Sequence, residues 1–121
     1  MKILLVDDSE SFRKSMVQLI ESSCKSPTFK EAATVAEGIR LSKDLDADAV
    51  LLDMRFPDGL GLDVLRVIRK DPHPVLVIVL TNYSSDQFRA KALLDGADYF
   101  LDKATEFEKA VAILKEKEEV L

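Results

Sequence analysis

Six consecutive apolar residues constrain the fold of this chain more than any other segment: Val75-Leu76-Val77-Ile78-Val79-Leu80. The run is rich in β-branched residues, which favours a strand. Because every position is apolar, both faces of that strand should be buried, as in the middle of a parallel sheet with helices on both sides. The segment therefore predicts an α/β domain.

Strand-like and helix-like segments alternate five times over the 121 residues, a length typical of one domain. Strands are expected at residues 3–6, 28–33, 49–52, 75–80 and 99–101, and helices at residues 9–22, from 34, 60–70, from 84 and from 105. The second strand is mixed in polarity, so it should lie at a sheet edge. We therefore expect a five-stranded parallel sheet in the order 2-1-3-4-5, flanked by five helices in a flavodoxin-like, doubly wound fold.

Three expected helix starts carry a Ser or Thr followed three residues later by Glu or Gln, the pattern of a capping box. The pairs are Thr34 with Glu37, Ser84 with Gln87, and Thr105 with Glu108. Gly96 should lie just past the end of the helix that starts near residue 84.

Composition excludes several classes of protein. The net charge of −5 argues against direct nucleic-acid binding, because contacts to phosphates need clustered Lys and Arg. No apolar run approaches the roughly 20 residues of a membrane-spanning helix, so no membrane insertion is expected. The single cysteine cannot form an internal disulfide, and the apolar run near the N-terminus is too short for a signal peptide. The chain is expected to be cytoplasmic.

Polar side chains follow four of the five expected strands, at the point where each strand ends. These residues are Asp7, Asp8, Asp53, Thr81, Asp102 and Lys103. The carboxyl ends of parallel strands meet at one edge of the sheet, where open α/β sheets bind their ligands. Taken alone, Asp53 fits a helix cap or a residue of the turn at Pro57-Asp58-Gly59. The other strand ends favour a functional role for it.

Three carboxylates in one pocket, those of Asp7, Asp8 and Asp53, would repel one another. Two unit charges about 4 Å apart repel by ~4 kcal/mol at an effective dielectric of ~20, so the cluster must protonate or recruit a cation. Oxygen ligands select a hard ion, and without a calcium loop of the EF-hand type the expected cofactor is Mg²⁺. Thr81 offers a hydroxyl donor and Lys103 a positive charge, so the set predicts phosphoryl transfer to an Asp nucleophile.

Four motifs in this order and spacing carry a resemblance to a known family. They are Leu5-Val6-Asp7-Asp8-Ser9, Leu51-Leu52-Asp53-Met54-Arg55-Phe56-Pro57-Asp58-Gly59, Val79-Leu80-Thr81 and Gly96-Ala97-Asp98-Tyr99-Phe100-Leu101-Asp102-Lys103. The chain resembles the receiver domain of two-component response regulators, of the stand-alone, chemotaxis-regulator-like type. The resemblance covers residues 1–121 as one receiver domain.

The resemblance implies that Asp53 accepts a phosphoryl group from a phosphohistidine. The domain would be a signalling phosphoacceptor that catalyses its own phosphorylation and dephosphorylation, and not an enzyme acting on a separate substrate. Asp8, Asp53 and the backbone carbonyl of Arg55 would ligate Mg²⁺ directly, with Asp7 acting through a bound water.

The resemblance also implies a switch. Thr81 and Lys103 would contact the phosphoryl oxygens, and Phe100 would occupy the aromatic position that repacks as Thr81 moves. The implied partners are a sensor histidine kinase or a histidine phosphotransfer protein, together with an unknown downstream protein. Residues 85–114 would present the face for that partner or for a homodimer.

The chain departs from the family pattern after Lys103 and at Phe100. Lys103 is followed by Ala104, whereas the family usually has a proline after a cis peptide bond. A non-proline cis bond costs about 3–4 kcal/mol, so either the surroundings hold that strain or the bond is trans. Phe100 replaces the commoner Tyr, so packing alone must carry the switch.

Three further residues could control access to Asp53. Asn82 is larger than the small residue common at its position, and Arg55 is long enough to reach the mouth of the site. We hypothesise that Arg55, Asn82 and Tyr83 set how fast water attacks the aspartyl phosphate.

Three other readings compete with a phosphorylated receiver. A receiver-like interaction module that is not phosphorylated is suggested by Asn82 and Ala104. A phosphatase of the haloacid-dehalogenase type would have a second Asp at the position of Arg55. A nucleotide or flavin binder would need a Gly-rich or hydroxyl-rich first loop, where this chain has Asp7-Asp8-Ser9-Glu10-Ser11.

Overall fold

The computed structural model describes residues 1–43 and 46–121, and its central feature is a parallel five-stranded sheet. The strand order is β2-β1-β3-β6-β7. The strands are β1 (Lys2–Val6), β2 (Thr28–Ala32), β3 (Ala49–Leu52), β6 (Leu76–Thr81) and β7 (Tyr99–Asp102). Counted within this sheet alone, the order is the predicted 2-1-3-4-5, with the mixed-polarity strand β2 at one edge. The predicted fold class is confirmed.

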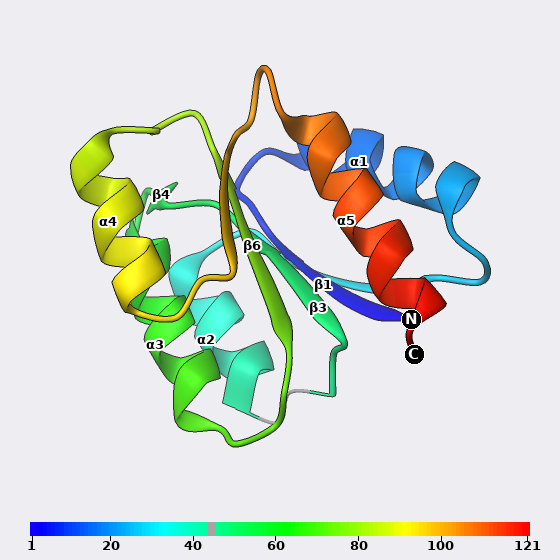
Figure 1. Ribbon diagram of the computed structural model, residues 1–121. Helices are drawn as coiled ribbons and strands as arrows, with labels where there is room; N and C mark the ends of the chain where they lie inside the picture. Colours follow the sequence, from blue (N-terminus) through cyan, green and yellow to red (C-terminus); the bar gives the residue numbers. More distant parts are fainter. Residues whose placement is uncertain (44–45) are drawn as a thin grey trace.

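Helices cover both faces of the sheet, as Figure 1 shows. On one face lie α1 (Glu10–Ser23) and α5 (Phe107–Glu119), and on the other lie α2 (Val35–Lys43), α3 (Gly61–Lys70) and α4 (Asp86–Leu94). Within the described ranges, none of the helices has the length and apolar character needed to cross a membrane.

Alternate residues of each central strand enter two separate hydrophobic cores. Val77 and Val79 of β6 belong to the cluster under α2, α3 and α4, whereas Ile78 and Leu80 belong to the cluster under α1 and α5. Because both faces of β6 are covered, every position of its central run is apolar.

A small hairpin between β3 and α3 was not predicted. Strand β4 (Arg55–Phe56) pairs antiparallel with β5 (Gly59–Leu60), and the predicted turn at Pro57 and Asp58 connects them. The Asp58 carboxylate accepts hydrogen bonds from the N–H groups of Val35 at 2.9 Å and Ala36 at 3.1 Å. The hairpin thus caps α2.

Two predictions of helix ends are confirmed. At α2, the Thr34 hydroxyl accepts the Glu37 N–H at 3.1 Å as predicted, whereas the Glu37 carboxylate accepts the N–H of Ala33, one residue before Thr34, at 3.3 Å. Gly96 lies just past α4 with a φ of 110°, a conformation that favours glycine.

The two other predicted capping boxes are wrong. Helix α4 is capped by Ser85, whose hydroxyl accepts the Phe88 N–H at 3.2 Å, and not by the pair Ser84 and Gln87. Ser84 instead donates to the Asp102 carboxylate at 3.0 Å.

The start of α5 also differs from the prediction of Thr105 and Glu108. Glu106 is the N-cap residue and makes no side-chain capping bond. The Thr105 N–H donates to Asp102 Oδ1 at 3.1 Å, so Asp102 orders the loop before the helix.

Candidate functional site

Main-chain hydrogen bonds continue past the strand ends and bring the polar residues together. The Asp53 N–H donates to the Val6 carbonyl at 2.9 Å, and the Lys103 N–H donates to the Thr81 carbonyl at 2.9 Å. Strands β1 and β3 are neighbours at the point where the strand order reverses, which is where folds of this type bind ligands. The site therefore lies at the predicted edge of the sheet.

Three carboxylates form a cluster there. Asp7, Asp8 and Asp53 each offer an oxygen, and these oxygens all lie within 4.8 Å of one another. Asp7 and Asp53 are buried, whereas Asp8 is exposed. This all-oxygen donor set fits a hard divalent cation.

Lys103 bridges the two buried carboxylates. Its Nζ lies 2.7 Å from Asp7 Oδ2 and 3.2 Å from Asp53 Oδ2, and the residue is 9% exposed. Burial raises the pKa of Asp7, and the hydrogen bonds from Lys103 and the Ser9 N–H oppose that rise without cancelling it. Burial lowers the pKa of Lys103, but the hydrogen bond to Asp7 and the charge of Asp53 outweigh it, so that pKa is raised. Lys103 thus stays charged and partly neutralises the cluster.

Thr81 is buried at the carboxyl end of β6, and Phe100 is buried in β7. The Thr81 hydroxyl oxygen accepts the Tyr83 N–H at 3.1 Å, which leaves its hydrogen available to donate. The guanidinium carbon of Arg89 on α4 lies 5.8 Å from the centroid of the Phe100 ring, and its Nη1 donates to the Phe100 carbonyl at 3.0 Å. Arg89 therefore covers the predicted switch residue.

An open cleft leads from solvent to Asp53. Its lining includes Asp8, Asp53, Arg55, Asn82, Tyr83 and Lys103. The guanidinium carbon of Arg55 lies 4.7 Å from the centroid of the Tyr83 ring, within the range of a cation–π contact. The three residues predicted to control access thus all line the entrance to Asp53.

The family model of the response regulator receiver domain matches residues 3–115. The chain belongs to this family. The nitrate/nitrite response regulator protein NarP of Escherichia coli is 38% identical over 105 residues, which cover 84% of this chain and 47% of NarP. The chain thus spans about half the length of the curated relatives it matches.

Solved structures agree with this assignment. A receiver domain protein (CheY-like) from Methanospirillum hungatei superposes with a TM-score of 0.86 at 27% identity, covering 98% of this chain and 93% of that one. A response regulator from Burkholderia pseudomallei, solved with a phosphorylated aspartic acid, a calcium ion and citrate, gives a TM-score of 0.80 at 25% identity. It covers 98% of this chain and 69% of that one. The acidic pocket of this receiver domain fits the phosphorylation site of the family.

The structure shows which form the peptide bond between Lys103 and Ala104 takes. The Lys103–Ala104 peptide bond is trans. The Ala104 N–H donates to Asp102 Oδ1 at 2.9 Å. The receiver domain therefore positions Lys103 without a cis peptide bond.

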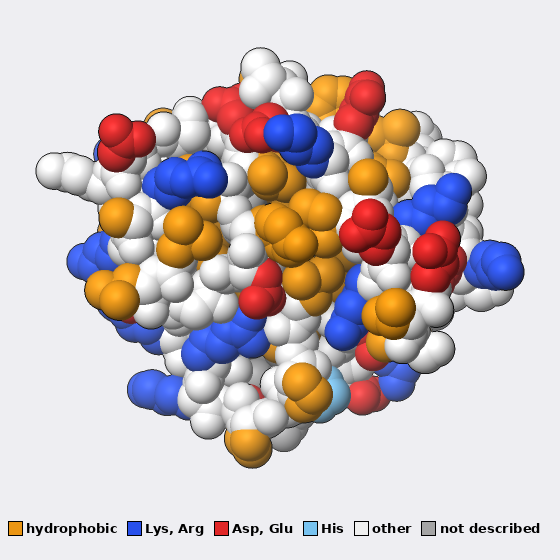
Figure 2. All heavy atoms as spheres, viewed as in Figure 1, with side chains coloured by type: hydrophobic (Ala, Val, Ile, Leu, Met, Phe, Trp, Pro, Cys, Tyr) orange, Lys and Arg blue, Asp and Glu red, His pale blue; other side chains and the backbone are white. Residues whose placement is uncertain are grey.

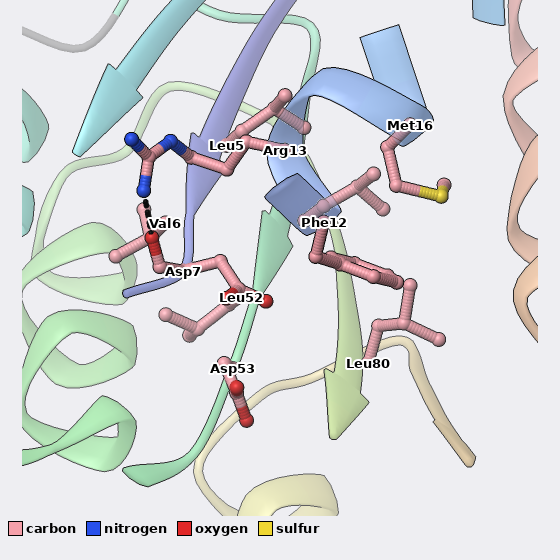
Figure 3. A pocket seen from close by; sticks show the side chains of 10 residues that line it. Leu5, Val6, Asp7, Phe12, Arg13, Met16, Leu52, Asp53 and Leu80 are labelled. Atoms are coloured by element: carbon pink, nitrogen blue, oxygen red, sulfur yellow. Dashed lines mark hydrogen bonds between the residues drawn. The ribbon is translucent and has the colours of Figure 1, made fainter. Parts of the chain in front are cut away.

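Two residues of the receiver domain that touch the site were not predicted to do so. Phe12 and Arg13 lie in the first turn of α1 (Figure 3). The Lys103 Nζ lies over the Phe12 ring. Arg13 Nη1 donates to the Asp7 carbonyl at 2.5 Å, the bond dashed in Figure 3. Phe12 has the helical spacing of a core residue, and that pattern carries no signal of a contact with a residue far along the chain.

Proposed function

We propose that Asp53 is the phosphoacceptor of this receiver domain, within a receiver unit spanning residues 1–121. The observation that carries the proposal is the cluster of Asp7, Asp8 and Asp53 bridged by Lys103 at the carboxyl edge of the sheet. The phosphorylated aspartic acid of the Burkholderia pseudomallei relative supports the same chemistry here.

The reaction is a transfer from a phosphohistidine of a sensor histidine kinase or a histidine phosphotransfer protein. An Asp53 carboxylate oxygen attacks the phosphorus, and the bond from phosphorus to the imidazole nitrogen breaks. The nitrogen keeps the electron pair and takes up a proton, which leaves a neutral imidazole and an aspartyl phosphate. Attack of water on the phosphorus later restores the carboxylate and releases inorganic phosphate. The receiver domain supplies the groups for both steps.

The residues present fit a bound Mg²⁺. Asp8, Asp53 and the backbone carbonyl of Arg55 would hold the ion directly, and Asp7 through a water. When bound, Mg²⁺ supplies positive charge next to the transferring phosphoryl group. Lys103 supplies a second positive charge from the chain itself, already 3.2 Å from Asp53 Oδ2.

Thr81 and Phe100 form the proposed switch. Thr81 has a hydroxyl hydrogen free to donate to a phosphoryl oxygen, and its movement would change the packing beside Phe100. Because Phe100 has no hydroxyl group, its position depends on packing and on the contact with Arg89.

The switch would act on the surface formed by α4, β7 and α5. Figure 2 shows hydrophobic side chains gathered between α4 and α5. Leu94 and Tyr99 are 85% and 42% exposed on this surface. We propose that it binds the downstream protein or a second copy of the domain. Several relatives are DNA-binding regulators, and in this chain we expect any such activity to depend on a partner.

Arg55, Asn82 and Tyr83 are proposed to set the lifetime of the aspartyl phosphate. The contact between Arg55 and Tyr83 joins strand β4 to the segment that follows β6, and both residues line the cleft. A water molecule that attacks the phosphorus must pass them.

One experiment tests the proposed function. The protein is incubated with Mg²⁺ and acetyl phosphate, and an acid-stable, alkali-labile adduct is sought by intact mass. We expect one phosphoryl group per chain in the wild type and none in Asp53→Ala. If no adduct forms even with a cognate kinase, the chain is an interaction module. Sustained turnover of a phosphoester would indicate a phosphatase.

A further inference from the structure

The ammonium group of Lys103 has a third neighbour besides its two carboxylates. Its Nζ lies 4.2 Å from the centroid of the Phe12 ring. A cation within about 6 Å of a ring centroid is attracted by the ring, and the attraction is stronger where water is excluded. At 9% exposure, Lys103 meets that condition.

The Phe12 ring is held in place from two directions. The main-chain N–H of Phe12 donates to the hydroxyl of Ser9, the N-cap residue of α1, at 3.2 Å. The side chain packs against the core under α1 and α5, next to Met16 and Leu80 (Figure 3). These contacts keep the backbone and the ring of Phe12 beside Lys103.

The carboxylate partners of Lys103 have other tasks in the proposed reaction. Asp53 becomes an aspartyl phosphate, and Asp7 serves the metal ion, so their interactions with Lys103 must change as the reaction proceeds. Phe12 neither ionises nor binds a metal. The contact between the Phe12 ring and Lys103 can therefore persist unchanged throughout the proposed reaction.

We propose that Phe12 is a positioning residue, which holds the Lys103 ammonium group at the phosphoacceptor through a cation–π contact. This inference rests on the proposed phosphorylation of Asp53. The first turn of α1 would thus help to place the positive charge of Lys103 beside Asp53.

Phosphorylation kinetics provide the first test. We expect Phe12→Leu to lower the rate constant with Mg²⁺ and acetyl phosphate by about threefold to tenfold, and Phe12→Tyr to stay within about twofold of the wild type, because its ring is retained. Phe29→Leu is the matched control. Phe29 packs on the same core but pairs with Ile3 near the opposite end of the strands. It should leave the rate unchanged.

A double-mutant comparison separates positioning from a general structural role. In a Lys103→Met background, Phe12→Leu should cause no further loss, because the group that Phe12 positions is already absent. An equal loss in both backgrounds, or an equal loss in Phe12→Tyr, would overturn the proposal.

NMR of the metal-free protein provides a readout that does not depend on activity. Protons of the Lys103 side chain near the face of the ring should be shifted upfield in the wild type and in Phe12→Tyr, and not in Phe12→Leu. An unchanged Lys103 spectrum in Phe12→Leu would refute the contact. A wild type that forms no adduct would instead refute the proposed function, and the positioning role in phosphorylation with it.

Discussion

Gly61 packs directly against the main chain of Asp53. A β-carbon at position 61 would overlap the Asp53 carbonyl oxygen. The Gly61 N–H also donates to the Met54 carbonyl at 2.7 Å. The loop that carries Asp53, the proposed phosphoacceptor, can therefore close onto the start of α3 only because residue 61 has no side chain.

Gly61→Ala should displace this main chain. We expect the free energy of unfolding in urea to fall by about 1–3 kcal/mol, as for other overpacked sites, and phosphorylation of Asp53 to slow. Gly38→Ala is a useful control, since a β-carbon there would meet only side-chain atoms of Val6 and Val64, at 3.0 and 3.2 Å. That variant should be phosphorylated at the wild-type rate. A Gly61→Ala protein with wild-type stability would contradict the packing argument.

Lys103 should stabilise the metal-free protein strongly. Lys103→Met leaves Asp7 and Asp53 buried without their cation, and we expect a loss of about 3 kcal/mol in urea unfolding with EDTA. Excess Mg²⁺ should reduce this loss, because ion binding stabilises the folded state. Lys109→Met, which removes an exposed pair with Glu106, should change stability by less than about 0.5 kcal/mol. Equal stability of wild type and Lys103→Met in EDTA would refute the expectation.

The strands and the gathering of their polar ends could be predicted from the sequence for a physical reason. Runs such as Val77–Leu80, apolar at every position, are typical of a parallel sheet covered on both faces, and that topology brings Asp53 and Lys103 to the same edge. The apolar pattern of each strand agrees with the place of that strand in the sheet, so the pattern alone was sufficient to predict the sheet and its polar edge.

Helix starts and long-range contacts could not be predicted in the same way. Ser84 and Ser85 offer the same hydroxyl at adjacent positions, and the choice between them depends on Asp102, a distant residue that binds Ser84. The strands β4 and β5 have two residues each, too few to show a period. The contact between Phe12 and Lys103 joins residues whose separate patterns indicate only a core position and a strand end.

The stacked pair of Arg55 and Tyr83 should lengthen the lifetime of the aspartyl phosphate by limiting the access of water. We expect Arg55→Ala and Tyr83→Ala each to shorten its half-life several-fold. The double variant should be little worse than either single variant, because both remove one contact. Tyr99→Ala is matched in exposure, 42% against 44% for Tyr83, and lies away from the cleft, so it should have no effect. Unchanged half-lives in the single variants would exclude this role.

The cap that Asp58 provides for α2 should make stability depend on pH. Hydrogen bonds from the N–H groups of Val35 and Ala36 lower the pKa of Asp58 in the folded protein. A carboxylate with a lowered folded-state pKa stabilises the protein above its unfolded-state value of about 3.9, and that contribution disappears as the pH falls through the folded-state pKa. Asp58→Ala should therefore melt at a lower temperature than wild type at neutral pH, and the difference should shrink below about pH 4. Circular dichroism melts across this range provide the measurement, with Glu116→Ala, an exposed acid of α5, as the control. A difference that grows on acidification would show that Asp58 does not cap α2 as a carboxylate.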